Sequence, residues 1–468
     1  MADAMQDKSQ AAPAFSPGVI GRAAGWLRGP GLLPRLVHAG IGSALVRVAG
    51  MGFGFLFGVQ LARGLGPSGY GIYGLAMSII TVLAVPIQFG LPQLVVREVA
   101  AAQAREEWGR VRGILRWSSR AVLITSAVTA VAVLIGLLVS ERGFGSPFAR
   151  ALLIGVVMLP LLAYGALRGA TLLGLHFPVR AQAPNELLRP AMFSLLLFAV
   201  PLVFRIKLDP ALAMGLGAAS AGFAILCYGR MLHRALPAAA HEAAPQMQPR
   251  AWRRSAFPMA LSEGMRVLQG QLMTLVLGMM QVAAVVGVFR VASSVALLIA
   301  TPVSLLNVIC APLISRLHTQ GAHARLQRMI SWVALAMTIM AVLLMLPFFI
   351  AGHELLGRIF GHAFAASNAP LLILCVGVIG NACCGLNAQV LNMVGLEQRV
   401  TRAFAISLVV LALLTPPMVY AWQDSGAALA STISVLLWNV LMWRDAWTRA
   451  HLDTSVFSFM RSRERGDG

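Results

Sequence analysis

Residues 71–78 are Gly-Ile-Tyr-Gly-Leu-Ala-Met-Ser, and residues 287–294 are Gly-Val-Phe-Arg-Val-Ala-Ser-Ser. The second segment follows the first by 216 positions, and Pro86 and Pro302 repeat with the same offset. Glycine, aromatic, aliphatic, alanine, serine and proline residues recur in register. The alternative is coincidence among residues that are common in membrane helices. An internal repeat of this length predicts two halves with similar folds.

The composition restricts the chain to one broad class. Of 468 residues, 58% are hydrophobic and 12% are charged, and the mean hydropathy is +0.77. A soluble domain has about twice that share of charged residues. A soluble enzyme, a disordered protein and a secreted disulfide scaffold are therefore excluded. The sequence predicts an all-α polytopic membrane protein.

Apolar stretches of roughly 20 residues mark the membrane spans. Twelve are expected, at 42–62, 70–95, 121–140, 151–173, 190–204, 210–230, 257–281, 286–311, 329–351, 370–393, 403–422 and 426–443. The offset of 216 maps the first span onto the seventh and the second onto the eighth. A shift of six spans keeps orientation, which predicts two six-helix lobes around a central cavity.

The domain boundaries follow from this count. We expect a tail at 1–40 with an interfacial helix, an N-lobe at 41–232, a basic linker at 233–255, a C-lobe at 256–445 and a tail at 446–468. A second interfacial segment is expected at 97–118, where tryptophans alternate with arginines.

The basic residues set the expected topology. Of the 37 basic residues, 35 are arginine, and the net charge is +20. With the N-terminus inside, 27 fall on cytoplasmic segments and six on the opposite side. This bias predicts cytoplasmic termini, so the charge reflects membrane topology rather than nucleic-acid binding.

The loops leave no room for a catalytic domain. No nucleotide-binding glycine loop or Ser–His–Asp set appears in the sequence, and no outward loop has paired carboxylates. The five cysteines all lie in predicted spans, without metal-ligand spacing. The sequence therefore predicts a transporter, with no catalytic residues, cofactor or metal site.

Five ionisable residues fall inside predicted spans, where a charge normally faces a cavity or a partner. They are Arg47, Arg168, Glu263, Arg266 and Arg290. The alternatives are an ion pair of Glu263 with Arg266 or Arg47, and snorkelling of Arg168 and Arg290 to the membrane surface. A surplus of arginine suits a phosphate-bearing substrate. Gln271, Asn387 and Gln389 are candidate contacts for sugar hydroxyls, or bonds between helices.

The run Leu61-Ala-Arg-Gly-Leu-Gly-Pro-Ser-Gly-Tyr-Gly-Ile-Tyr-Gly-Leu-Ala76 resembles the start of Wzx-type oligosaccharide flippases. These belong to the multidrug/oligosaccharidyl-lipid/polysaccharide exporter superfamily. Looser matches are Val96-Arg97-Glu98, Leu167-Arg168-Gly169 and 286–292, and the resemblance covers roughly residues 40 to 445. Near Gln271 many relatives have Asp, so Glu263 is the remaining carboxylate for ion coupling.

The resemblance implies a function and its partners. Such proteins move undecaprenyl-diphosphate-linked oligosaccharide units across the bacterial inner membrane for O-antigen, exopolysaccharide or capsule assembly. We expect Arg47, Arg266, Arg290 and Arg168 to bind the diphosphate, and Glu263 to couple an ion. The expected partners are this lipid-linked oligosaccharide, membrane lipids and polysaccharide polymerase or export components. No nucleic acid is expected, and the chain is expected to be a monomer.

Three alternatives stay open. A multidrug antiporter of the same superfamily should have more buried acids than bases. A lipid II flippase should have fourteen spans by family resemblance. A non-transporting scaffold of a polysaccharide synthase complex would need no buried arginines.

Overall fold

The computed structural model describes residues 32–139 and 145–458, and within them every regular element is a helix. The long helices are α2 (Leu32–Gln88), α4 (Trp108–Val139), α5 (Pro147–Gly174), α7 (Arg189–Phe204), α8 (Pro210–Ala235), α10 (Pro249–Met280), α11 (Ala283–Thr319), α12 (His323–Phe360), α13 (Asn368–Cys383) and α15 (Glu397–Arg449). Shorter ones are α3 (Leu91–Ala104), α6 (Pro178–Gln182), α9 (Ala238–Glu242), α14 (Asn387–Met393), and two of other type, η1 (Ala183–Leu188) and η2 (His362–Ser367).

The number of spans agrees with the sequence prediction. Nine helices of the described chain are long and apolar enough to cross a membrane. Two of them, α2 and α15, each contain two spans joined across a kink. The twelfth is α10, which falls below the others in hydropathy because it carries Glu263, Arg266 and two glutamines. The fold is thus an all-α membrane bundle of about twelve spans.

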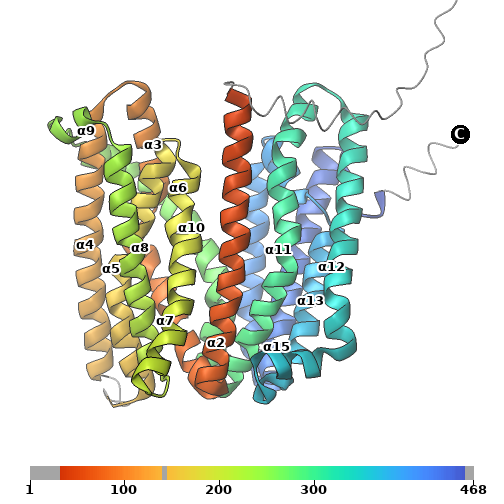
Figure 1. Ribbon diagram of the computed structural model, residues 1–468. Helices are drawn as coiled ribbons and strands as arrows, with labels where there is room; N and C mark the ends of the chain where they lie inside the picture. The colour runs from red at the N-terminus through yellow and green to blue at the C-terminus, as the bar shows by residue number, and fades with distance from the viewer. Residues whose placement is uncertain (1–31, 140–144, 459–468) are drawn as a thin grey trace, which may run out of the picture.

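The helices form two bundles side by side (Figure 1). The N-lobe contains α2 to α8, and the C-lobe contains α11 to α15. We call the end that carries α9 the linker end, and the end where α2 bends the kink end. Figure 1 shows the lobes meeting toward the kink end and diverging toward the linker end.

The bend in α2 separates the first two spans. Gly66 has a φ of 65°, a left-handed conformation that costs glycine little, and Pro67 then begins the second span. The result is a tight reversal of the chain, which explains why the run 61–76 is rich in glycine. It also brings the second half of α2 against α11.

Two glycines of the repeat make the lobe interface possible. A Cβ at Gly71 would overlap the carbonyl of Ala283, and one at Gly287 would overlap the carbonyl of Pro67. Both pairs are related by the offset of 216, because Gly71 corresponds to Gly287 and Pro67 to Ala283. The segments that repeat in sequence therefore pack on each other with approximate two-fold symmetry. This symmetric packing is what an internal repeat predicts.

Further contacts join the lobes at the kink end. The Arg63 guanidinium donates hydrogen bonds to the carbonyl oxygens of Ile359 (2.7 Å) and Arg358, at the C-terminus of α12. Phe55 packs edge-to-face on Phe360, with ring centroids 5.7 Å apart. Tyr70 packs in the same way on Phe364, at 6.2 Å.

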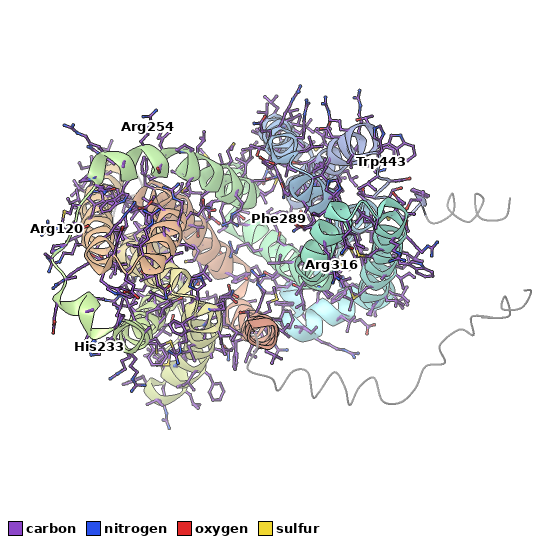
Figure 2. All side chains as sticks on the ribbon, turned by 90° about the horizontal axis from the view of Figure 1, so that it is seen from above. Arg120, His233, Arg254, Phe289, Arg316 and Trp443 are labelled. Carbon is purple, nitrogen blue, oxygen red and sulfur yellow. The ribbon has the colours of Figure 1, made fainter. Side chains whose placement is uncertain are left out.

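Helix α10 contacts both lobes. Its N-terminal part contacts α3 of the N-lobe, while its other half packs on α15. Figure 2, viewed from the linker end, shows α10 running from Arg254, beside the N-lobe, toward Phe289 at the centre. Helix α10 therefore connects the two lobes along its length.

Glu98 holds this end of α10 in place. Its carboxylate accepts hydrogen bonds from Arg110 (2.8 Å), Arg97 (3.2 Å) and the indole of Trp252 (3.3 Å). Burial alone would raise the pKa of Glu98, but the bonds from Arg110 and Arg97 outweigh it and the pKa is lowered. Trp252 also packs on Trp117, with centroids 5.5 Å apart.

Several boundaries differ from the sequence predictions. The short fifth span extends backward through η1 and α6 to Pro178, which makes a helical segment of 27 residues. The expected interfacial segment at 97–118 is divided between α3 and the beginning of α4. Helix α2 begins at Leu32, inside the predicted N-terminal tail; the interfacial helix predicted there lies mostly outside the described residues.

Candidate functional site

A cavity of about 730 Å³ lies between the lobes. Residues of α2, α5, η1, α7, α8, α10, α11, α13 and α15 line it. Its volume is in the range of small-molecule sites, and its place between two repeats is where transporters bind substrates.

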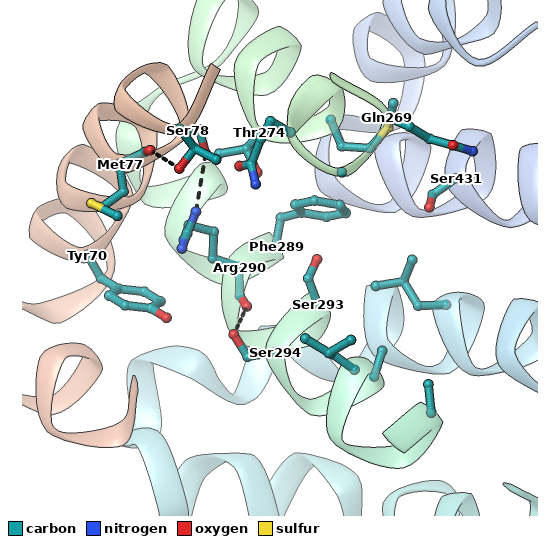
Figure 3. Close-up of a pocket in the computed structure, with 18 of the residues that line it drawn as sticks. Tyr70, Met77, Ser78, Gln269, Thr274, Phe289, Arg290, Ser293, Ser294 and Ser431 are labelled. Atoms are coloured by element: carbon teal, nitrogen blue, oxygen red, sulfur yellow. Dashed lines mark hydrogen bonds between the residues drawn. The ribbon is translucent and has the colours of Figure 1, made fainter. Parts of the chain in front are cut away.

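Arg290 projects into this cavity from α11. One guanidinium nitrogen, Nη1, donates to the carbonyl oxygen of Gly74 (3.2 Å) and to the hydroxyl of Ser78 (3.3 Å). The guanidinium carbon lies 5.9 Å from the centroid of the Tyr70 ring. Figure 3 shows the side chain directed toward α2. The Arg290 Nε is buried without a hydrogen-bond partner in the described structure, so this cation keeps donor capacity.

Arg189 is the second cation in the cavity lining. It follows the π-helical turn η1, which has Pro184 inside it, and precedes Pro190. Its side chain donates to Asn185 (3.3 Å), which also lines the cavity. Tyr73, Arg189 and Arg290 all line this same cavity.

The span predicted at 190–204 leaves Arg189 outside it, among the basic residues expected on cytoplasmic segments. The structure places Arg189 in the cavity lining instead, because the helical segment begins at Pro178, twelve residues before the predicted start at Pro190. A signal was present in the two prolines around Asn185 and Arg189. A π-helical turn is often found at functional sites.

The opposite wall is neutral and polar. Gln269 and Gln271 of α10, Asn381 of α13, and Ser431 and Trp438 of α15 line it. Figure 3 shows Ser431 and Gln269 on the far side of Phe289 from Ser78. Among the described lining residues the charged ones are Arg189 and Arg290, and neither has an acidic neighbour in that lining.

Of the residues predicted for the site, Arg290 and Gln271 line the cavity. Arg47 does not line it; its side chain is 48% exposed and pairs with Glu186, at 3.6 Å. Arg266 is 73% exposed and forms an ion pair with Glu263, one turn away on α10. The simple ion pair considered from the sequence is therefore present, and Glu263 lies outside the cavity lining.

The remaining predicted residues have structural partners or lie elsewhere. Arg168 donates to the carbonyl oxygen of Ile225 (2.8 Å), which joins α5 to α8 inside the N-lobe. Asn387 is buried and bonds the side-chain oxygen of Asn439 (2.9 Å), which joins α14 to α15. Gln389 is half-buried on α14, outside the cavity lining.

The arrangement favours an anionic group over a cationic one. Two guanidinium groups can each offer paired donors to phosphate oxygens. A phosphate would replace the backbone and hydroxyl acceptors that now hold Arg290. An organic cation would find aromatic rings but no counter-charge among the described lining residues.

The family comparison covers the larger part of the chain. Residues 37–318 match the model of a family described as "Polysaccharide biosynthesis protein". No curated protein matches the sequence.

Solved transporters share the fold at low sequence identity. One is an inward-facing multidrug resistance MATE family transporter of the MOP superfamily: 10% identity, TM-score 0.68, with 92% of this chain and 99% of that chain covered. Another is the lipid II flippase MurJ in an inward closed conformation: 13% identity, TM-score 0.66, 88% of each chain. A third, from Pyrococcus furiosus, is a MOP superfamily transporter described by a reverse polarity of its binding pocket: 12% identity, TM-score 0.58, 88% and 95% covered.

Proposed function

Because the chain belongs to the polysaccharide biosynthesis protein family and has the fold of MOP superfamily transporters, we propose that it is a flippase for polyprenyl-diphosphate-linked oligosaccharides. The observation that carries the proposal is the pair of cavity arginines, Arg189 and Arg290, in a described lining without an acidic side chain. The substrate's diphosphate would bind these guanidinium groups, and its glycan would fill the neutral part of the cavity.

The proposed orientation places the linker end in the cytoplasm. The connections at this end in Figure 1 adjoin Arg105 at the C-terminus of α3, Arg254 near the start of α10 and Arg316 in the last turn of α11, and an excess of arginine is typical of cytoplasmic loops. In this orientation the lobes diverge toward the cytoplasm. The structure would then represent the state that receives substrate from the inner leaflet of the bacterial inner membrane.

Transport follows from rocking of the two lobes. Arg189 belongs to the N-lobe and Arg290 to the C-lobe, although Arg290 rests on α2 of the N-lobe. A diphosphate bound by both arginines would offset part of their repulsion and draw the lobes together around it. Opening at the kink end would then expose the substrate to the other leaflet while the polyprenyl tail stays in lipid.

The test is a sidedness assay in a strain that lacks this gene. An impermeant glycosidase or lectin is applied to intact spheroplasts, and the accessible polyprenyl-linked glycan is measured. We expect repeat units to accumulate facing the cytoplasm. Wild type should restore outward exposure, while Arg290→Gln and Arg189→Gln should reduce its rate by about tenfold, the effect of losing about 1.4 kcal/mol of binding.

Arg358→Gln is the matched control, because this side chain is 78% exposed and lies at the kink end, outside the cavity lining. It should behave as wild type. Normal outward-facing units in the deletion strain would contradict the proposal. Export of organic cations by the wild type, unaffected by Arg290→Gln, would favour the multidrug antiporter instead.

A further inference from the structure

The neutral wall of the cavity contains a group of hydrogen-bonding side chains that have no protein partner. Gln271, Ser293, Asn381, Ser431 and Trp438 all line the cavity. Their side chains form no hydrogen bond among the described residues. All five are half-buried, and their polar atoms remain accessible to solvent. Polar groups on a cavity wall without protein partners are free to bind a ligand.

These side chains converge from four helices. Gln271 comes from α10, Ser293 from α11, Asn381 from α13, and Ser431 and Trp438 from α15. Neighbouring polar groups differ from them, since Thr432 donates to the carbonyl oxygen of Ile373 (2.8 Å) and Gln269 to Ser407 (3.4 Å). The wall thus has groups that serve the fold and a separate set that does not.

Trp438 adds a large aromatic surface to this wall. Its ring packs edge-to-face on Phe404, with centroids 4.3 Å apart, and this contact restrains the orientation of the indole. Trp438 also contributes to the cavity lining. A supported aromatic ring beside neutral donors and acceptors matches a pyranose, which has an apolar face of C–H groups and a rim of hydroxyls.

We infer that this wall is a sugar-binding subsite, separate from the arginines, in which Trp438 stacks on a pyranose and Asn381, Gln271 and Ser431 bind its hydroxyls. The inference rests on the proposed function, since it assigns the glycan of that substrate to the C-lobe. Phe289 lies between the two regions in Figure 3, with Arg290 on one side and Ser431 on the other. The diphosphate and the sugar would therefore bind on opposite sides of Phe289.

The test compares two lipids with the purified full-length protein in nanodiscs. One is undecaprenyl diphosphate, and the other is the undecaprenyl-diphosphate-linked repeat unit extracted from the deletion strain. We expect wild type to bind the repeat unit about tenfold more tightly than the bare lipid. Trp438→Leu and Asn381→Leu should weaken repeat-unit binding to the level of the bare lipid, and leave the bare lipid's affinity unchanged.

Two further variants support this design. Trp438→Phe keeps a ring against Phe404 and should retain part of the preference, which separates stacking from folding. Trp332→Leu removes a tryptophan that is 55% exposed on α12, outside the cavity lining, and should change neither affinity.

The possible contrary results are distinguishable. If wild type binds both lipids equally, or if folded Trp438→Leu keeps the full preference, the sugar subsite is wrong and the flippase proposal stands. If wild type binds neither lipid, the proposed function fails, and the subsite fails with it.

Discussion

Gly74 and Arg290 occupy equivalent positions in the two repeats, since they are 216 residues apart. Near the approximate two-fold axis there is room for one long side chain, and the glycine provides that room for the arginine. A Cβ on residue 74 would overlap the Cδ of Arg290. The two repeats differ at this position, and this difference places a cation in the cavity.

Gly74→Ala should therefore act on transport through Arg290. The added methyl group displaces the guanidinium from Gly74 and Ser78, and we expect the flipping rate to fall by up to about tenfold, toward that of Arg290→Gln. The measurement is the spheroplast sidedness assay at matched protein levels. Gly222→Ala is the control, because a Cβ there meets no atom within 4 Å. Full activity of Gly74→Ala would show that the position of Arg290 is unimportant.

At the scale of elements, Glu98 connects three helices. It lies on α3, accepts from Arg110 of α4 and from Trp252 of α10, and is almost fully buried. Glu98→Gln would leave Arg110 without its charge partner, which we expect to lower stability by about 2–3 kcal/mol at neutral pH.

The pH dependence of this contribution has a definite sign. The pKa of Glu98 is lower in the fold than its ordinary value of 4.5, so its stabilisation is present above that value and is lost as the pH falls through the folded pKa. The melting temperatures of wild type and Glu98→Gln should differ most at pH 7, and the difference should narrow as the pH falls below the ordinary pKa of 4.5. Glu354→Gln, at an exposed pair with Arg358, should show little difference at any pH. A constant gap down to pH 3.5 would contradict an ionised Glu98.

The elements also show what the sequence could and could not predict. Hydropathy and the repeat predicted the spans, because lipid requires long apolar helices whatever their partners are. They did not place Arg189, because Pro190 suggested a helix boundary where a π-helical turn continues the helix instead. Arg290 was predicted because it interrupts an apolar stretch. Arg266 interrupts one in the same way, and its exposed pairing with Glu263 depends on how α10 is rotated, which hydropathy does not report.

For the whole molecule, Arg63 is placed to stabilise one of the two transport states. It bridges the lobes at the kink end by donating to the free carbonyl groups at the C-terminus of α12. These bonds can exist only while the kink end is closed. Because the side chain is exposed, we expect them to contribute about 1 kcal/mol to the closed state, which corresponds to about fivefold in population.

Arg63→Gln should accordingly shift the lobes toward closure at the linker end. Spin labels at Arg234→Cys and Thr448→Cys, both exposed near the linker end on different lobes, report their separation after the native cysteines are replaced. We expect the population with the shorter distance to increase by about fivefold. Arg358→Gln is the control, since the carbonyl of that residue, and not its side chain, accepts from Arg63. If the distance distribution of Arg63→Gln equals that of wild type, the bridge does not determine the balance between the two states, and the packing of Gly71 and Gly287 must hold the kink end closed without it.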